Sequence, residues 1–135
     1  MKILAFNLKK VNAEKFSAKV ENLKINTHID VSSIEEVKSD VFKFKEEALS
    51  ISFSFKIEYE PEYASIEIGG VILLSVDSKI SREVLKQWKD KLIPDNFKMP
   101  LFNLILQKSS IRAIQLEEEL NLPLHFQLPS LIKKD

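Results

Sequence analysis

The stretch YASIEIGGVILLSV, Tyr63 to Val76, is the most informative part of the sequence, because it holds both glycines of the chain inside an apparent β-strand. Glycine weakens a strand interior, so the adjacent pair Gly69 and Gly70 indicates a bulge or a close approach of another backbone. The run Val71 to Leu74 is apolar on both faces of the strand, since successive side chains point to opposite sides. We therefore expect this end of the strand to be covered on both sides, as an oligomer interface would do.

Three earlier segments alternate between apolar and polar residues, which is the pattern of half-buried strands. The clearest runs from Leu49 to Tyr59 and places every apolar residue on one face; weaker ones cover Leu4 to Leu8 and Leu23 to Val31. Pro61 suits the turn before the glycine strand because proline lacks a backbone N–H. The segments predict an antiparallel four-stranded sheet with one dry and one wet face.

Phe42 and Phe44 alternate in the opposite phase to the Leu49 to Tyr59 strand. A kink near residues 46–48 would reconcile the two phases, and a separate edge segment is the alternative.

The hydrophobic period changes after Val76, which predicts two helices. Ser81 is a good N-cap for a short helix that Pro94 ends, and residues 95–99 are expected to form a loop. Pro100 is placed to open a long helix that continues to about Leu120. Its apolar stripe is too broad for one face, so we expect this helix to be packed on two sides. Apolar residues also alternate in the following tail, which predicts an extended arm on apolar surface.

Composition narrows the class of protein. Twenty Lys and Arg balance twenty Asp and Glu, and a net charge of zero argues against a nucleic-acid binder. The absence of cysteine fits a cytoplasmic protein without disulfides or thiolate catalysis. The longest apolar run is far shorter than the roughly 20 residues of a membrane span, so we expect no membrane insertion. At 135 residues the chain is expected to form a single domain, residues 1–135.

Catalytic and metal-binding patterns are weak, so we expect neither an enzyme nor a cofactor. His28 and His125 are far apart in sequence and are interpreted as surface residues, because a metal site would need both plus carboxylates. The run Glu117 to Glu119 is interpreted as the solvated side of the long helix.

Four stretches, in this order and spacing, resemble the SecB family of export chaperones. They are FNLKKV at Phe6–Val11, ENLKINTHIDV at Glu21–Val31, IEIGGVILLSV at Ile66–Val76, and MPLFNLILQKSSIRAIQLEEELNLPLHFQLP at Met99–Pro129. The resemblance implies an α+β fold: a four-stranded antiparallel sheet followed by a short helix, a long C-terminal helix and an extended arm. It also implies a cytoplasmic homo-oligomer, a dimer or tetramer, whose apolar grooves hold unfolded or precursor polypeptides without ATP.

Aromatic and flexible apolar residues in irregular segments are the candidates for polypeptide binding. They are Phe42, Phe44, Phe97, Met99, Phe126 and Leu128. The candidates for an oligomer interface are Val71, Leu73, Trp88 and Leu101. Ordinary packing within the chain is the alternative for each, and it is the preferred interpretation for Phe53 and Phe55, which lie on a regular strand face.

SecB proteins are usually acidic and dock the basic tail of their ATPase on acidic sheet surface, whereas this chain is neutral. The neutral charge favours a second hypothesis, a dedicated protein-binding or assembly adaptor with one fixed partner.

Overall fold

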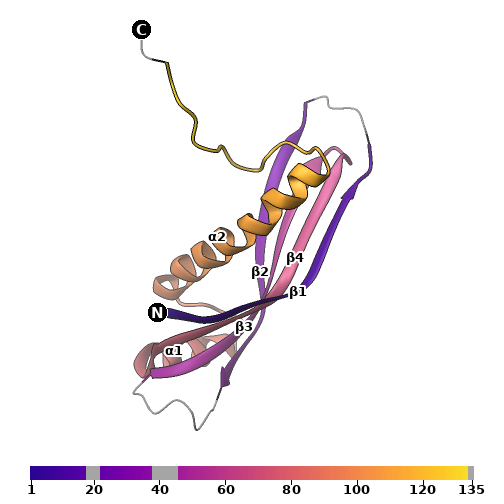
Figure 1. Ribbon diagram of the computed structural model, residues 1–135. Helices are drawn as coiled ribbons and strands as arrows, with labels where there is room; N and C mark the ends of the chain where they lie inside the picture. The colour runs from indigo at the N-terminus through magenta and orange to yellow at the C-terminus, as the bar shows by residue number, and fades with distance from the viewer. Residues whose placement is uncertain (18–21, 38–45, 134–135) are drawn as a thin grey trace.

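A computed structural model describes residues 1–17, 22–37 and 46–133 as two layers, a twisted sheet with both helices on one face (Figure 1). The strands are β1 (Lys2–Lys15), β2 (Lys24–Val37), β3 (Glu46–Glu60) and β4 (Ala64–Asp77), and the helices are α1 (Ser78–Trp88) and α2 (Asp95–Glu119). All strand pairs are antiparallel, in the order β1-β4-β3-β2. The α+β prediction is confirmed. Phe42 and Phe44 lie outside the described residues.

The glycine pair of β4 faces a bulge in β1, as the sequence predicts. The β1–β4 register shifts between Leu8 and Lys10, directly opposite Gly70 and Gly69. A Cβ atom added at Gly70 would overlap the backbone of β1 at Asn7, whereas one at Gly69 would meet only ordinary contacts. Gly70 is therefore required for the close approach of β1 to β4.

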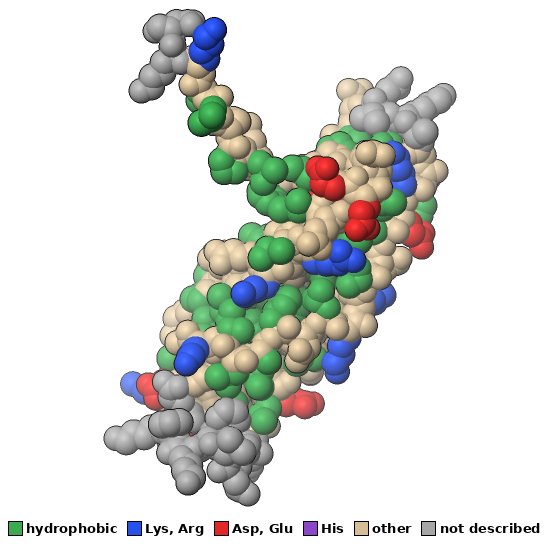
Figure 2. Space-filling view, in the orientation of Figure 1, with side chains coloured by type: hydrophobic (Ala, Val, Ile, Leu, Met, Phe, Trp, Pro, Cys, Tyr) green, Lys and Arg blue, Asp and Glu red, His purple; other side chains and the backbone are tan. Residues whose placement is uncertain are grey.

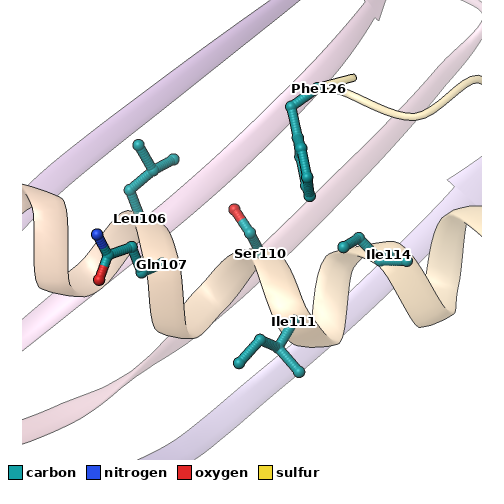
Figure 3. A pocket seen from close by; sticks show the side chains of 6 residues that line it. All are labelled: Leu106, Gln107, Ser110, Ile111, Ile114 and Phe126. Atoms are coloured by element: carbon teal, nitrogen blue, oxygen red, sulfur yellow. The ribbon is translucent and has the colours of Figure 1, made fainter. Parts of the chain in front are cut away.

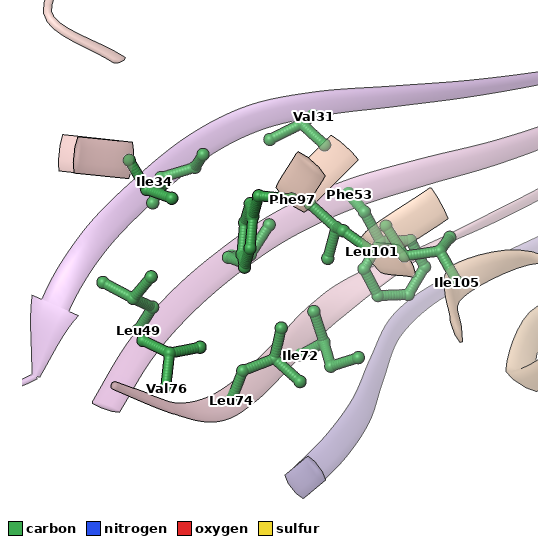
Figure 4. Packing of buried hydrophobic residues seen from close by; sticks show 12 residues of the cluster. Val31, Ile34, Leu49, Phe53, Ile72, Leu74, Val76, Phe97, Leu101 and Ile105 are labelled. Carbon is green, nitrogen blue, oxygen red and sulfur yellow. The ribbon is translucent and has the colours of Figure 1, made fainter. Parts of the chain in front are cut away.

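The apolar face of β3 forms the floor of the core, and its alternation is confirmed. Phe53 and Phe55 are 4% and 0% exposed, and Tyr59 is 1% exposed. Phe53 belongs to a cluster under α1 and the first half of α2 (Figure 4), whereas Phe55 and Tyr59 belong to a second cluster under the end of α2. The two clusters fill the space between the sheet and the helices along its whole length.

The predicted starts of both helices are wrong. Helix α1 begins at Ser78 after Asp77, whose side chain accepts a hydrogen bond from the Lys79 N–H, and Ser81 is buried inside the helix. Helix α2 begins at Asp95, so residues 95–99 are helical and Pro100 lies inside the helix. Phe97 is 3% exposed in the core, and its burial stabilises the extra turn before the proline.

Within the described residues, the sheet covers one side of helix α2, and part of another face stays open to solvent. Leu101, Ile105 and Ala113 are fully buried against the sheet, but Ile111 on another face is 61% exposed. The predicted packing on a second side is therefore incomplete within the described residues, and full cover of this face stays a prediction.

Candidate functional site

The end of α2 reverses the chain by a Schellman motif. Asn121 has a φ of 53°, in the left-handed region that asparagine tolerates. The Leu122 N–H donates to the Glu117 carbonyl at 2.8 Å, and the Asn121 N–H donates to the Glu118 carbonyl at 3.3 Å. This turn sends the following residues back along α2; we call residues 121–133 the arm. Because of the turn, residue 125 returns to the level of residue 117.

A buried polar network anchors the arm to α2 and to β3. One carboxylate oxygen of Glu117 lies 2.6 Å from His125 Nδ1, and the other accepts the His125 backbone N–H at 2.7 Å. The second oxygen also lies 2.6 Å from the Tyr59 hydroxyl. On the other side of the imidazole ring, His125 Nε2 is 2.9 Å from the hydroxyl of Ser110. Four side chains from β3, α2 and the arm thus meet at one point.

The sequence interpretations of Glu117 and His125 are wrong. The side chain of Glu117 is 0% exposed and that of His125 is 3% exposed, so neither lies on the surface. His28, by contrast, is a surface residue as predicted, with a side chain that is 62% exposed. Each buried polar group has hydrogen-bond partners here, which is the condition under which burial of a charge is tolerated.

The hydrogen bonds of Glu117 determine which atoms of the network donate protons and which accept them. A carboxylate next to Nδ1 holds the proton on that nitrogen, which leaves Nε2 as an acceptor for the Ser110 hydroxyl when His125 is neutral. Burial raises the pKa of Tyr59, and the hydrogen bond with Glu117 adds to the shift. The Tyr59 hydroxyl also lies 2.6 Å from the Pro123 carbonyl oxygen. Since the hydroxyl carries one proton, it donates to only one of these oxygens at a time.

The order Ser110, His125, Glu117 has the geometry of a serine nucleophile with its base and acid. Its setting does not support that chemistry. Ser110 lies in the middle of α2, where backbone N–H groups belong to the helix ladder and cannot stabilise an oxyanion. The serine is also 9% exposed, so a substrate has little access to its hydroxyl. We assign the network a structural role, the anchoring of the arm to α2 and β3.

An apolar hollow of about 350 Å³ lies beside this anchor, on the face of α2 that the sheet does not cover (Figure 3). Phe126 from the arm stands over Ser110 and Ile114, and Leu106 and Ile111 extend the surface along the helix. We call this the α2 hollow. Figure 2 shows the same region as hydrophobic side chains gathered along α2 and the arm.

A second hollow of about 580 Å³ lies between β2 and the connection from α1 to α2. Trp88, Ile93 and Phe102 provide apolar surface there, and charged residues form its rim. Lys91 lies over the Trp88 ring at 4.7 Å, and Lys98 lies over the Phe102 ring at 5.5 Å. We call this the β2 hollow.

The predicted binding residues fall in different places. Phe126 lines the α2 hollow, and Leu128 in the arm is 47% exposed. Met99 is 62% exposed at the start of α2, whereas Phe97 is buried in the core.

The predicted interface residues also divide. Val71 and Leu73 are partly buried on the sheet face opposite the helices, and Trp88 lines the β2 hollow. Leu101 is 0% exposed and packs inside this chain. The sequence reasoning missed the β2 hollow as a whole, because Ile29, Ile93 and Phe102 come from three separated segments.

No group of three His, Cys, Asp or Glu among residues 1–17, 22–37 and 46–133 could hold a metal ion. Neither α1 nor α2, the helices in the described part of the chain, is long and apolar enough to cross a membrane.

No protein-family model and no curated protein sequence matches the chain. Among solved structures, the chain is similar to the Mycobacterium tuberculosis Rv1957 SecB-like chaperone, in complex with a ChAD peptide from the Rv1956 HigA1 antitoxin. The superposition covers 99% of this chain and 92% of that chain, with a TM-score of 0.53. This chain has a SecB-like fold. At 15% sequence identity the likeness shows the fold alone.

Proposed function

We propose that this protein is a SecB-like chaperone that holds extended apolar segments of non-native polypeptides without ATP. The α2 hollow carries the proposal, because Leu106, Ile111 and Phe126 leave apolar surface open to solvent along one face of α2. Exposed apolar surface gathered in one place is the usual mark of a protein-binding site. The fold of the Rv1957 SecB-like chaperone supports the same role.

The size of the hollows sets the strength of binding. Each large apolar side chain buried in them would contribute about 1.5–3 kcal/mol, and a client segment that fills both would bury two or three. Ordering an extended chain offsets much of that gain. We therefore expect weak, reversible binding with little sequence preference, which suits a holding chaperone.

The sheet provides a second means of contact. In the described part of the chain, β1 and β2 are the edge strands, and neither pairs with a strand on its outer side. An extended segment can add to such an edge through backbone hydrogen bonds, which do not depend on its side chains.

A second candidate function is a dedicated adaptor with one fixed polypeptide partner. The zero net charge favours it, since generic export would use an acidic docking surface. The Rv1957 SecB-like chaperone also binds a peptide from one particular antitoxin. Breadth of binding separates the two candidates, because an adaptor should ignore unrelated unfolded chains.

We further propose that the protein is a cytoplasmic homo-oligomer, a dimer or tetramer, and that it needs no cofactor. Val71 and Leu73 on the outer sheet face are the surface that a second copy would cover. Sedimentation equilibrium of the wild type and of a Leu73→Ser variant tests this, and a monomeric wild type at micromolar concentration would refute it.

The function is tested by suppression of aggregation of two unrelated unfolded proteins, at stoichiometric amounts and without ATP. Ile111→Ser should reduce holding, because Ile111 lines the α2 hollow. Phe16→Ser is the matched control, since Phe16 is 58% exposed, close to the 61% of Ile111, and lines neither hollow. If the wild type holds neither protein, the chaperone proposal fails; if it holds both and the two variants behave alike, the α2 hollow is not the site.

A further inference from the structure

Tyr59 and Glu117 grip the arm partly by its backbone. Tyr59 reaches the Pro123 carbonyl oxygen at 2.6 Å, and Glu117 accepts the His125 N–H at 2.7 Å. In an extended chain, the carbonyl of one residue and the N–H of the second residue after it point to the same side. A donor and an acceptor side by side therefore match an extended backbone of any sequence.

The segment held by Tyr59 and Glu117 lies on a strip of apolar surface along α2, and the chain covers only part of this strip. Phe126, next to His125, forms a wall of the α2 hollow together with Leu106. Phe102, one helical turn before Leu106, lines the β2 hollow. The arm thus covers one part of a strip along α2, while the hollows leave the rest of it open.

We propose that Tyr59 and Glu117 form a main-chain clamp for an extended polypeptide segment, now occupied by the chain's own arm as an internal competitor. The ligand is a segment without regular structure that presents a carbonyl and an N–H two residues apart, with an apolar side chain next to the N–H residue. The natural ligand of the clamp follows from the proposed function, a non-native polypeptide. The clamp adds how the backbone of that polypeptide is bound.

The arm holds itself in the clamp through His125. Besides the backbone grip, His125 Nδ1 meets Glu117 and Nε2 meets Ser110, and both contacts need the imidazole. Beyond His125 the arm has little cover: Phe126 and Leu128 are 40% and 47% exposed, and Leu131 is fully exposed. Removing the imidazole should therefore weaken the arm as a competitor while the clamp stays intact.

The experiment uses the full-length protein and a fluorescein-labelled peptide with the sequence of residues 120–130, LNLPLHFQLPS. Fluorescence anisotropy gives its affinity for the wild type, His125→Ala, and His125→Ala combined with Tyr59→Phe. We expect His125→Ala to bind the peptide about tenfold more tightly than the wild type, because the arm vacates the clamp more often. Adding Tyr59→Phe should weaken binding about fivefold, as expected for the loss of one hydrogen bond.

His28→Ala is the matched control, since it removes the same side chain at an exposed position and should leave the affinity unchanged. The fluorescence of Trp88 reports whether each variant is folded. If His125→Ala does not fold, hydrogen exchange of the wild-type His125 amide decides instead. Exchange that is faster than global unfolding, and faster still with excess peptide, supports an arm that leaves the clamp; exchange only by global unfolding overturns it.

The outcomes separate the clamp from the chaperone function. Equal affinity of the wild type, His125→Ala and the double variant overturns the clamp, whether or not unfolded proteins are held. Tight binding to His125→Ala that falls with Tyr59→Phe supports the clamp even when the aggregation test fails. A peptide that binds equally well with and without the Tyr59 hydroxyl shows apolar docking alone and also overturns the clamp.

Discussion

The two neighbouring glycines of β4 make a sharp test of the packing, because the structure predicts opposite results for the same substitution. A Cβ atom at residue 70 would lie 2.2 Å from the carbonyl oxygen of Asn7 and 3.1 Å from the Cα atom of Leu8. At residue 69 the nearest atoms would be the Phe53 carbonyl oxygen at 3.5 Å and Lys10 Cβ at 3.6 Å. Neither glycine has a positive φ, so steric contact alone distinguishes them.

The loss of unfolding free energy on Gly70→Ala follows from how far β1 must move. Ordinary Cβ contacts begin at 3.4 Å, so Gly70→Ala would push the β1 backbone away by roughly 1 Å, beyond hydrogen-bonding distance from β4. Losing about two ladder hydrogen bonds, together with the strain of an overfilled site, should cost about 2–4 kcal/mol of unfolding free energy. Gly69→Ala should change it by less than about 1 kcal/mol, with a small gain from reduced freedom of the unfolded chain.

Urea denaturation followed by the fluorescence of Trp88, the one tryptophan of the chain, gives both unfolding free energies. The midpoint of Gly70→Ala should fall well below that of the wild type, and the midpoint of Gly69→Ala should stay close to it. Equal midpoints for the two variants, or a greater loss for Gly69→Ala, would refute the close approach of β1 to β4 at residue 70.

Two further predictions concern the end of α2 and its anchor. Asn121→Gly should raise the unfolding free energy by a few tenths to about 1 kcal/mol and Asn121→Ala should lower it by about 1 kcal/mol, because φ is 53° there; thermal denaturation of both variants checks the sign. The raised pKa of Tyr59 contributes stability that is complete below the pKa of an unfolded tyrosine, about 10, and is lost as the pH rises above it. The difference in stability between the wild type and Tyr59→Phe, measured in urea from pH 8 to 11, should therefore shrink above about pH 10, and a constant difference would contradict the buried setting of Tyr59.

Features that depend on a repeating local pattern could be predicted from the sequence. The alternation from Leu49 to Tyr59 predicts the buried face of β3 because a strand places every second side chain on the same side. The Gly69–Gly70 pair predicts a close backbone approach because no other residue lacks a Cβ atom. Helix starts were harder to predict, since Pro100 is a good first residue by local rules alone. Phe97 packs in the core against the sheet, and this contact extends α2 by one turn on the N-terminal side of Pro100. Local rules do not include such a contact.

Hydrophobic period, proline and glycine act within a few residues, so the sequence was enough to predict the four strands, the two helices and the arm. The burial of Glu117 and His125, by contrast, depends on contacts that form only in the folded chain. A run of three glutamates and an isolated histidine ordinarily lie on the surface, and here the partner of Glu117 on β3, Tyr59, is 58 residues away. Polar groups are buried when distant segments satisfy their hydrogen bonds together, and no pattern along the chain records that meeting.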